Sequence, residues 1–177
     1  MSNLLFKILV TPFIIALRFT SFYHMSVFCS KIPFSIGDRF RFHFYKKILN
    51  NVGDNVHFSY GVIFTHKEIS IGNNVRFGPY NTIGLVDFGN DILIGQYTHF
   101  LSGKNQHGYD KKDIPINQQN GKQEKIFIAN DIWIGTGSIV MSNISQGTIV
   151  AAGSIVVKSF DEYCVIGGNP AKVIKKR

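Results

Sequence analysis

The pattern of apolar and small side chains between residues 126 and 157 repeats every six positions. In most repeats an aliphatic residue is followed by a small one, as in Ile134-Gly135 and Val150-Ala151. A period of six fits neither an amphipathic helix nor a simple alternating strand. It is typical of a parallel β-helix, in which the aliphatic side chain points into a three-sided prism and the small residue turns the corner.

The same phase extends upstream through residues 52–101, where Phe often takes the inward position. Chance matches in a Gly- and Ile/Val-rich sequence would give one or two such repeats, not a series of this length. The sequence therefore predicts an all-β fold, a parallel β-helix of about five coils. The predicted inward residues are Val52, Phe58, Phe64, Ile71, Phe77, Ile83, Phe88, Ile94, Phe100, Ile128, Ile134, Val140, Ile144, Val150 and Val156.

The pattern divides the chain into three segments. Residues 1–50 form an apolar and basic N-terminal segment with short helices, 51–160 form the β-helix, and 161–177 form a C-terminal arm. The repeat breaks after Leu101 and resumes at Ile126, which predicts an excursion loop over residues 102–125. Long loops in compact domains are usually functional or disordered, and a rigid scaffold is a common mount for a site.

Two helical patterns occur in the N-terminal segment. Residues 38–49 place Phe40, Phe44 and Ile48 on one face, which predicts a short helix with Asp38 as its N-cap that closes one end of the prism. His43 lies off this stripe and is expected to have a structural role. At the other end of the chain, residues 171–176 are expected to form a short helix or arm over the last coil.

Residues 4–17 are strongly apolar but are interrupted by Lys7 and Pro12, so they are too short and broken for a membrane span. No basic region and cleavage pattern of a secretory signal is found. Two interpretations have equal weight. The segment packs on the β-helix or on a neighbouring subunit, or it is an interfacial helix on the inner face of the membrane.

The net charge is +8, and residues 1–50 carry +6 of it, with seven basic residues and one acidic residue. No nucleic-acid-binding motif is present, so this excess indicates either a solvated face or contact with an anionic surface. Cys29 and Cys164 match no metal or redox spacing, which favours free thiols in a reducing compartment. The expected location is therefore cytoplasmic.

Four motifs occur in a fixed order: residues 102–107 (SGKNQH), 126–135 (IFIANDIWIG), 150–158 (VAAGSIVVK) and 168–174 (GNPAKVI). Over about residues 50–177 the chain resembles the hexapeptide-repeat acetyltransferases, in the branch of galactoside, maltose, and capsule or O-antigen sugar O-acetyltransferases. The resemblance implies a left-handed coil, a homotrimer, and acetyl-CoA as co-substrate in the groove between neighbouring β-helices. It implies no metal.

The resemblance also implies roles for individual residues. His107 matches the catalytic histidine, and Trp133 matches a tryptophan at the active-site end of the cofactor groove. Thr136 matches a small hydroxyl position near the pantetheine, and Ala152 matches a backbone contact to it. Lys158 matches a lysine near the phosphates of CoA.

Asn81 and Asp87 fall near the acceptor-binding asparagine and aspartate of the family, although the spacing differs by a few residues. Residues 1–50 differ from the helical acceptor-binding segment of galactoside-type enzymes, which argues against a small free galactoside or maltose as acceptor. The expected acceptor is a carbohydrate, namely a sugar hydroxyl of a bacterial surface polysaccharide or of its lipid-linked or nucleotide precursor.

Acetyl transfer to such a hydroxyl requires a base, because the hydroxyl ionises far above neutral pH, and a histidine suits this task. Other classes are weighed against this one. A γ-class carbonic anhydrase shares the fold but needs three histidines on one zinc ion, whereas His99 and His107 are eight residues apart. His57, His66 and His99 are expected at the surface or at a subunit interface.

A non-catalytic scaffold is the next alternative, and the lysine and tryptophan at cofactor-facing positions argue against it. The last is an amino-sugar N-acetyltransferase. Relatives of that kind often carry an N-terminal nucleotide-binding domain, and 50 residues leave no room for one.

Overall fold

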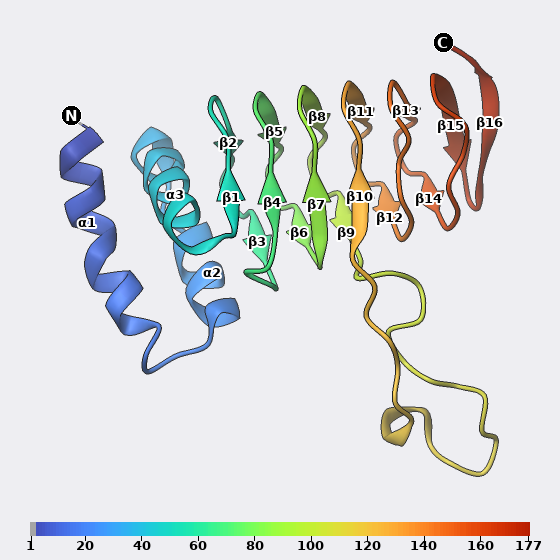
Figure 1. Cartoon of the computed structure of the whole chain (residues 1–177), viewed down its shortest axis with the longest axis horizontal. Helices are drawn as coiled ribbons and strands as arrows, with labels where there is room; N and C mark the ends of the chain where they lie inside the picture. The colour runs from blue at the N-terminus through green and yellow to red at the C-terminus, as the bar shows by residue number, and fades with distance from the viewer. Residues whose placement is uncertain (1–2) are drawn as a thin grey trace.

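A computed structural model describes residues 3–177, in which three helices stand at one end of a stack of short strands (Figure 1). The helices are α1 (Asn3–Ala16), α2 (Phe22–Ser30) and α3 (Phe34–Ile48). The strands are β1 (Asn51–Val52), β2 (His57–Phe58), β3 (Ile63–Phe64), β4 (Ser70–Ile71), β5 (Val75–Phe77), β6 (Thr82–Ile83), β7 (Val86–Phe88), β8 (Ile92–Ile94), β9 (His99–Phe100), β10 (Ile126–Ile128), β11 (Ile132–Ile134), β12 (Ile139–Val140), β13 (Ile149–Val150), β14 (Ile155–Val156), β15 (Cys164–Gly168) and β16 (Ala171–Lys176).

The strands form three sheets, and the chain visits the sheets in turn. The first sheet has the order β1-β4-β7-β10, the second β2-β5-β8-β11-β13-β15-β16, and the third β3-β6-β9-β12-β14. All pairs of strands are parallel except β15 with β16. The prediction of a parallel β-helix is thereby confirmed.

The core of the β-helix contains every residue that the repeat predicts to point inward. All fifteen are at most 5% exposed. In the first coils the core is aromatic: the ring of Phe77 lies 5.3 Å from Phe58, 5.6 Å from Phe64 and 5.0 Å from Phe88, measured between centroids. In the later coils Ile and Val fill the same space.

The corners between the first and second sheets are built from Gly and Asn. A Cβ on Gly72 would lie 2.4 Å from the carbonyl oxygen of Gly89, so the corners stack too closely for any side chain there. The side-chain oxygen of Asn73 accepts a hydrogen bond from the backbone of the coil before it, and Asn90 and Asn130 continue this ladder at 2.7–2.8 Å. Asn and Asp tolerate the left-handed backbone that the corner also needs, which is found at Asn55, Asn74, Asp91 and Asp131.

We call α1, α2 and α3 together the helical cap. The ring of Tyr45 on α3 closes the first coil, 5.0 Å from Phe58 and 4.7 Å from Phe64. The helix begins at Phe34, so the prediction of Asp38 as N-cap is wrong. Asp38 instead pairs with buried Arg41 at 2.5 Å, because it lies one turn away inside the helix. Arg41 also donates hydrogen bonds to the backbone carbonyls of Cys29, Ser30, Ile32 and Phe58.

The C-terminal segment differs from the expected helix. Residues 171–176 form strand β16, which pairs antiparallel with β15, and β15 continues the second sheet beside β13. The β-helix therefore extends past residue 160. The exposed edge of β15 offers unpaired backbone groups that a strand can satisfy and a helix cannot.

Helix α1 packs along α3 through Phe6 and Val10, which are fully buried. The packing interpretation named the β-helix or a neighbouring subunit as the partner, whereas this face of α1 packs on α3. No helix within residues 3–177 has the length and apolar character needed to cross a membrane.

Candidate active site

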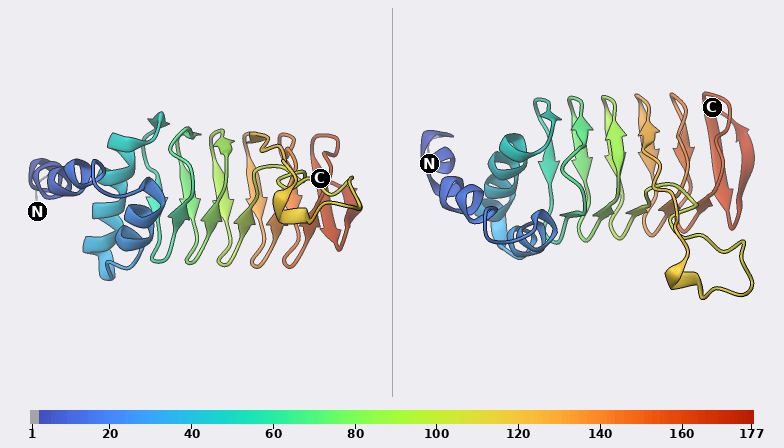
Figure 2. Two further views of the ribbon diagram at one scale, coloured as in Figure 1. Left: turned by 90° about the horizontal axis from the view of Figure 1, so that it is seen from below. Right: turned by 60° about the horizontal axis from the view of Figure 1, so that its bottom comes forward.

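The excursion loop leaves the scaffold after β9 in the third sheet and returns at β10 in the first (Figure 2). Its two arms are joined by backbone hydrogen bonds, from Lys122 to Asn105 at 2.7 Å and from Glu124 to Ser102 at 2.9 Å. Ser102 is buried, and its hydroxyl accepts a hydrogen bond from the backbone of Leu85 at 2.9 Å. These contacts fix the point at which the loop leaves the sheet.

His107 lies on the outgoing arm, and its side chain is exposed. It lines a shallow pocket between the two arms together with Tyr109, Asp110 and Asn120. A Cβ on Gly121 of the returning arm would lie 2.0 Å from the carbonyl oxygen of Gln106, so the arms touch beside His107. The backbone of His107 is therefore held while its ring faces outward.

Trp133 and Thr136 lie on the second sheet and at the corner after it. Trp133 points outward from β11 and is 55% exposed. A Cβ on Gly135 would lie 2.4 Å from the backbone nitrogen of Ala152, so Thr136 and Ala152 occupy successive coils at one corner. Both are exposed, as is Trp133 on the strand before Thr136, and we call these three residues the outer strip.

The space beside this strip is open. Gly137 and Gly153 have φ values of +71° and +68°, and a Cβ added to either would meet no atom within 4 Å. At the same corner in earlier coils, Tyr80 and Tyr97 take the left-handed position, and their rings stack 5.1 Å apart. The corner is thus aromatic in the early coils and bare in the later ones, a contrast that the repeat pattern alone did not predict.

Lys158 lies elsewhere, at the corner that follows the third sheet. Its ammonium group is 5.5 Å from the ring of Phe160, and it lines a hollow with Lys104, Glu124 and Lys125 at the base of the loop. His107, on the loop, and Lys158 therefore lie at the corner that follows the strands of the third sheet. Thr136 and Ala152 lie at the corner that precedes these strands. A single chain does not bring all the predicted cofactor residues together.

The two predicted acceptor-binding residues differ in their surroundings. The side chain of Asn81 has no exposed surface and donates a hydrogen bond to the carbonyl of Gly95 at 2.8 Å. Its burial is inconsistent with direct contact with an acceptor; it forms an internal polar ladder at the corner with Thr98, Ser138 and Ser154. Asp87 is partly exposed and pairs with Lys125 at 3.0 Å, next to the returning arm.

The other histidines of the coils are half-buried. The ring of His66 hydrogen-bonds Gln123 of the loop at 2.8 Å, and His57 lies 3.8 Å from Asp38. Across residues 3–177, no group of three or more His, Cys, Asp or Glu side chains is placed to hold a metal ion.

Comparison with known proteins gives the same scaffold. No protein-family model matches the chain. The chain is 30% identical over 127 residues to WbbJ of Escherichia coli K12, described as a lipopolysaccharide biosynthesis O-acetyl transferase, covering 67% of this chain and 63% of WbbJ. It is 28% identical over 135 residues to a galactoside O-acetyltransferase of Lactococcus lactis, covering 70% of this chain and 54% of that enzyme. The chain thus spans less than two thirds of either relative.

A solved structure extends the comparison to the whole fold. A hexapeptide-repeat acetyltransferase of Vibrio cholerae, solved with acetyl-CoA, superposes with a TM-score of 0.66 at 20% identity, covering 99% of this chain and 98% of that one. The chain is thus similar in sequence to O-acetyltransferases and similar in fold to a hexapeptide-repeat acetyltransferase. The predicted resemblance to these acetyltransferases is confirmed, and the solved structure, at 20% identity, shows the fold alone.

The structure also has a second cluster of polar residues, which the sequence analysis did not single out. His43, Lys46 and Lys47 on α3 face Lys7 on α1 across a cavity. The signal was present in the spacing, because positions i, i+3 and i+4 of a helix share one face. The position of Lys7 in this cluster depends on the packing of α1 on α3, so the sequence could not reveal it.

Proposed function

We propose that the protein is an acetyl-CoA-dependent O-acetyltransferase that acts on a sugar hydroxyl of a bacterial surface polysaccharide, or of its lipid-linked or nucleotide precursor. The observation that carries this proposal is the division of the predicted site between the two edges of the third sheet. His107 stands on the loop at one edge, and the strip of Trp133, Thr136 and Ala152 runs along the other. Two copies placed side by side would bring the two halves to one groove.

In the proposed mechanism His107 acts as general base. Its ring takes the proton of the acceptor hydroxyl as the oxygen attacks the thioester carbonyl, so the new ester bond forms as the carbon–sulfur bond breaks. The CoA thiolate leaves and recovers a proton from the imidazolium. A positioned base of this kind contributes about 10²–10⁴-fold to the rate.

The remaining residues would position the co-substrate. The bare corner at Gly137 and Gly153 has room for a slender pantetheine chain beside Thr136 and Ala152. Lys158, with its exposed ammonium group, would pair with a phosphate of CoA across the subunit boundary. Asp87 would lie near the acceptor, because it pairs with Lys125 at the base of the loop.

This arrangement requires an oligomer, and we propose the left-handed homotrimer of the family. Each groove would combine the loop edge of one β-helix with the strip of its neighbour. Light scattering of the purified protein should give three times the mass of 19.9 kDa. A monomer that turns over acetyl-CoA would contradict the shared site.

We place the reaction in the cytoplasm, with residues 1–50 at the inner face of the membrane. Both cysteines are free and buried, in keeping with a reducing compartment. A location at the membrane would bring the enzyme close to a lipid-linked acceptor, which supports that class among the open alternatives.

The test is thiol release from acetyl-CoA against a panel of free sugars, nucleotide sugars, amino-sugar nucleotides and lipid-linked oligosaccharides. His107→Ala should lose about 10²–10⁴-fold in kcat while it keeps its oligomeric state and its affinity for acetyl-CoA. His57→Ala is the matched control, because it removes a half-buried histidine on β2 of the first coil, whereas the loop follows β9 of the third coil. Wild-type turnover in His107→Ala would overturn the assignment of the base, and transfer to an amine alone would overturn the assignment of O-acetylation.

A further inference from the structure

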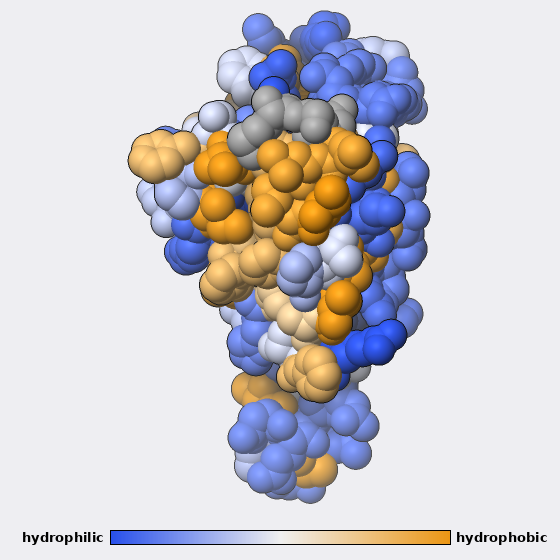
Figure 3. Space-filling view, turned by 90° about the vertical axis from the view of Figure 1, so that its left-hand side faces the viewer, coloured by the Kyte–Doolittle hydropathy of each residue, from blue (hydrophilic) through white to orange (hydrophobic). Residues whose placement is uncertain are grey.

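Helix α1 is apolar on both sides. Phe6 and Val10 pack on α3, but Leu4, Ile8 and Ile15 on the opposite side are 67%, 60% and 53% exposed. We call these three residues the outer face of α1. Figure 3 shows apolar side chains gathered over this end of the molecule and bordered by polar ones. A soluble helix that is packed on one side normally has polar residues on the other.

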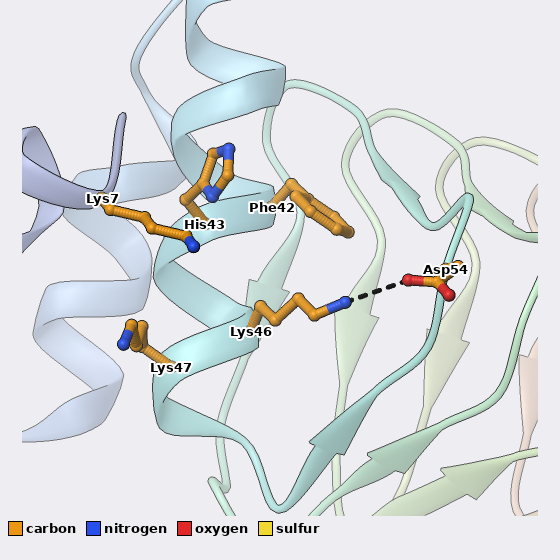
Figure 4. Close-up of a pocket in the computed structure, with 6 residues that line it drawn as sticks. All are labelled: Lys7, Phe42, His43, Lys46, Lys47 and Asp54. Atoms are coloured by element: carbon orange, nitrogen blue, oxygen red, sulfur yellow. Dashed lines mark hydrogen bonds and ion pairs between the residues drawn. The ribbon is translucent and has the colours of Figure 1, made fainter. Parts of the chain in front are cut away.

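Beside this face lies a cavity of about 530 Å³ between α1 and α3, which we call the cationic pocket. It is lined by Lys7, Phe42, His43, Lys46, Lys47 and Asp54. Lys7 reaches from α1 toward His43 (Figure 4), and Lys46 pairs with Asp54 at 3.1 Å. Within the described residues, neither Lys7 nor Lys47 forms an ion pair, so the pocket holds cationic groups with too few acidic partners.

The electrostatic environment of His43 shows the same excess of positive charge. Its ring stacks on Phe6 at 5.5 Å, and its pKa lies below the usual value because of burial and because Lys7, Arg39 and Lys46 repel a further proton. A site where cations repel one another is stabilised by an anion. A phosphate group matches this charge and accepts hydrogen bonds from several ammonium groups at once.

We propose that the cationic pocket binds the phosphate of an anionic lipid headgroup while the outer face of α1 lies in the membrane interface. The inference rests on the proposed location at the membrane and names the site that produces it. A helix of 14 residues is about 21 Å long, so it would lie in the plane of the membrane rather than cross it. Lys7 lies next to the outer face, which joins the two parts of the site.

A lipid fits better than the other occupants. A soluble phosphate compound would use the cationic pocket but would leave Leu4, Ile8 and Ile15 in water. A second copy of this chain would bury those side chains but would bring two sets of lysines, each within a segment of charge +6, toward one another. An anionic membrane satisfies both the apolar and the charged part.

The experiment is sedimentation of the full-length protein with vesicles of phosphatidylcholine alone or with 30% phosphatidylglycerol. The wild type should bind the anionic vesicles and lose binding as the salt concentration rises. Lys46→Gln/Lys47→Gln should weaken binding about 25-fold, since each lysine near an anionic surface contributes about fivefold. Leu4→Ser/Ile8→Ser should weaken it at least about 100-fold, because less apolar surface enters the interface.

Lys172→Gln/Lys175→Gln is the matched control, because it removes the same charge from exposed positions on β16 at the opposite end of the molecule. It should bind vesicles like the wild type. Equal loss in this control would show attraction by net charge alone and would overturn the pocket. Titration with inorganic phosphate separates the soluble ligand from the lipid: submillimolar binding of phosphate without vesicle binding would also overturn the proposal.

Acetyl-CoA turnover measured in the same samples separates this proposal from the proposed function. All three double variants should keep wild-type turnover and oligomeric state, which also shows that they are folded. Vesicle binding without any acetyl transfer would contradict the proposed function and leave the lipid site standing. Wild-type vesicle binding by both Lys46→Gln/Lys47→Gln and Leu4→Ser/Ile8→Ser would contradict the lipid site alone.

Discussion

The β-helix and the helical cap differ in how completely they bury their apolar side chains. In the β-helix, every aliphatic or aromatic residue predicted to point inward is at most 5% exposed. In the cap, α1 buries Phe6 and Val10 but leaves Leu4, Ile8 and Ile15 in solvent. The strands of three sheets together enclose the core of the β-helix, so inward side chains are covered on every side. Helix α1, at the end of the stack, packs on α3 with one face, and its other face has no partner.

The buried residues stabilise the fold, whereas the exposed apolar residues are free to contact another molecule. The aromatic core of the first coils and Tyr45 join the cap to the β-helix. The outer face of α1 makes no such contribution. Substitutions in the two regions should therefore change different quantities.

The largest expected effect is in the core. Phe77→Ala removes a fully buried ring that packs against three other phenylalanines, so it should lower the free energy of unfolding by about 3–5 kcal/mol. Ile8→Ser on α1 should change it by no more than about 0.5 kcal/mol. Chemical denaturation measures both, and a comparable loss in Ile8→Ser would show that the outer face of α1 is part of the core.

A second prediction concerns the joint between the two regions. Arg41→Met keeps most of the side-chain volume but leaves the carbonyls of Phe58 and Ile32 without their guanidinium donor, at a cost of about 3 kcal/mol. Limited proteolysis should then cut within residues 20–50 while the β-helix stays intact. Arg18→Met, an exposed change of the same chemistry, is the control, and equal resistance of both variants would contradict the role of Arg41.

A third prediction compares two glycines of the bare corner. Gly135→Ala would place a Cβ against the backbone of the next coil and should destabilise the protein by about 1–3 kcal/mol. Gly137→Ala meets no atom but has φ of +71°, so it should cost only about 1 kcal/mol. Thermal unfolding of the two variants tests the order, and the reverse order would show that the coils are less tightly stacked at Gly135 than described.

The smallest effect is a difference in labelling rates between the two cysteines. Burial raises the pKa of Cys29, in the cap, to about 12, so its thiol should react at pH 8 only when the cap opens. Cys164 lies in β15 and is also buried. Mass spectrometry after alkylation should still find Cys29 labelled first, because the cap has a partner on one side only and should open more often than β15, which pairs with both β13 and β16. Earlier labelling of Cys164 would mean that the C-terminal hairpin opens more easily than the cap.

The sequence by itself determined the β-helix and its inward residues, because a six-residue repeat has one structural explanation and each coil depends mainly on its neighbours. It also located the excursion loop, since the repeat stops and resumes in phase. The motifs indicated the family. Their roles at His107, Trp133, Thr136, Ala152 and Lys158 are still predictions.

The tertiary structure decided what depends on contacts between distant segments. Asn81 is turned inward, where its amide and the hydroxyl of Thr98 both donate hydrogen bonds to the carbonyl of Gly95. Residues 171–176 became a strand because the edge of β15 was unpaired. The cationic pocket exists only where Lys7 meets His43 and its neighbours on α3, since local spacing cannot specify how two helices pack.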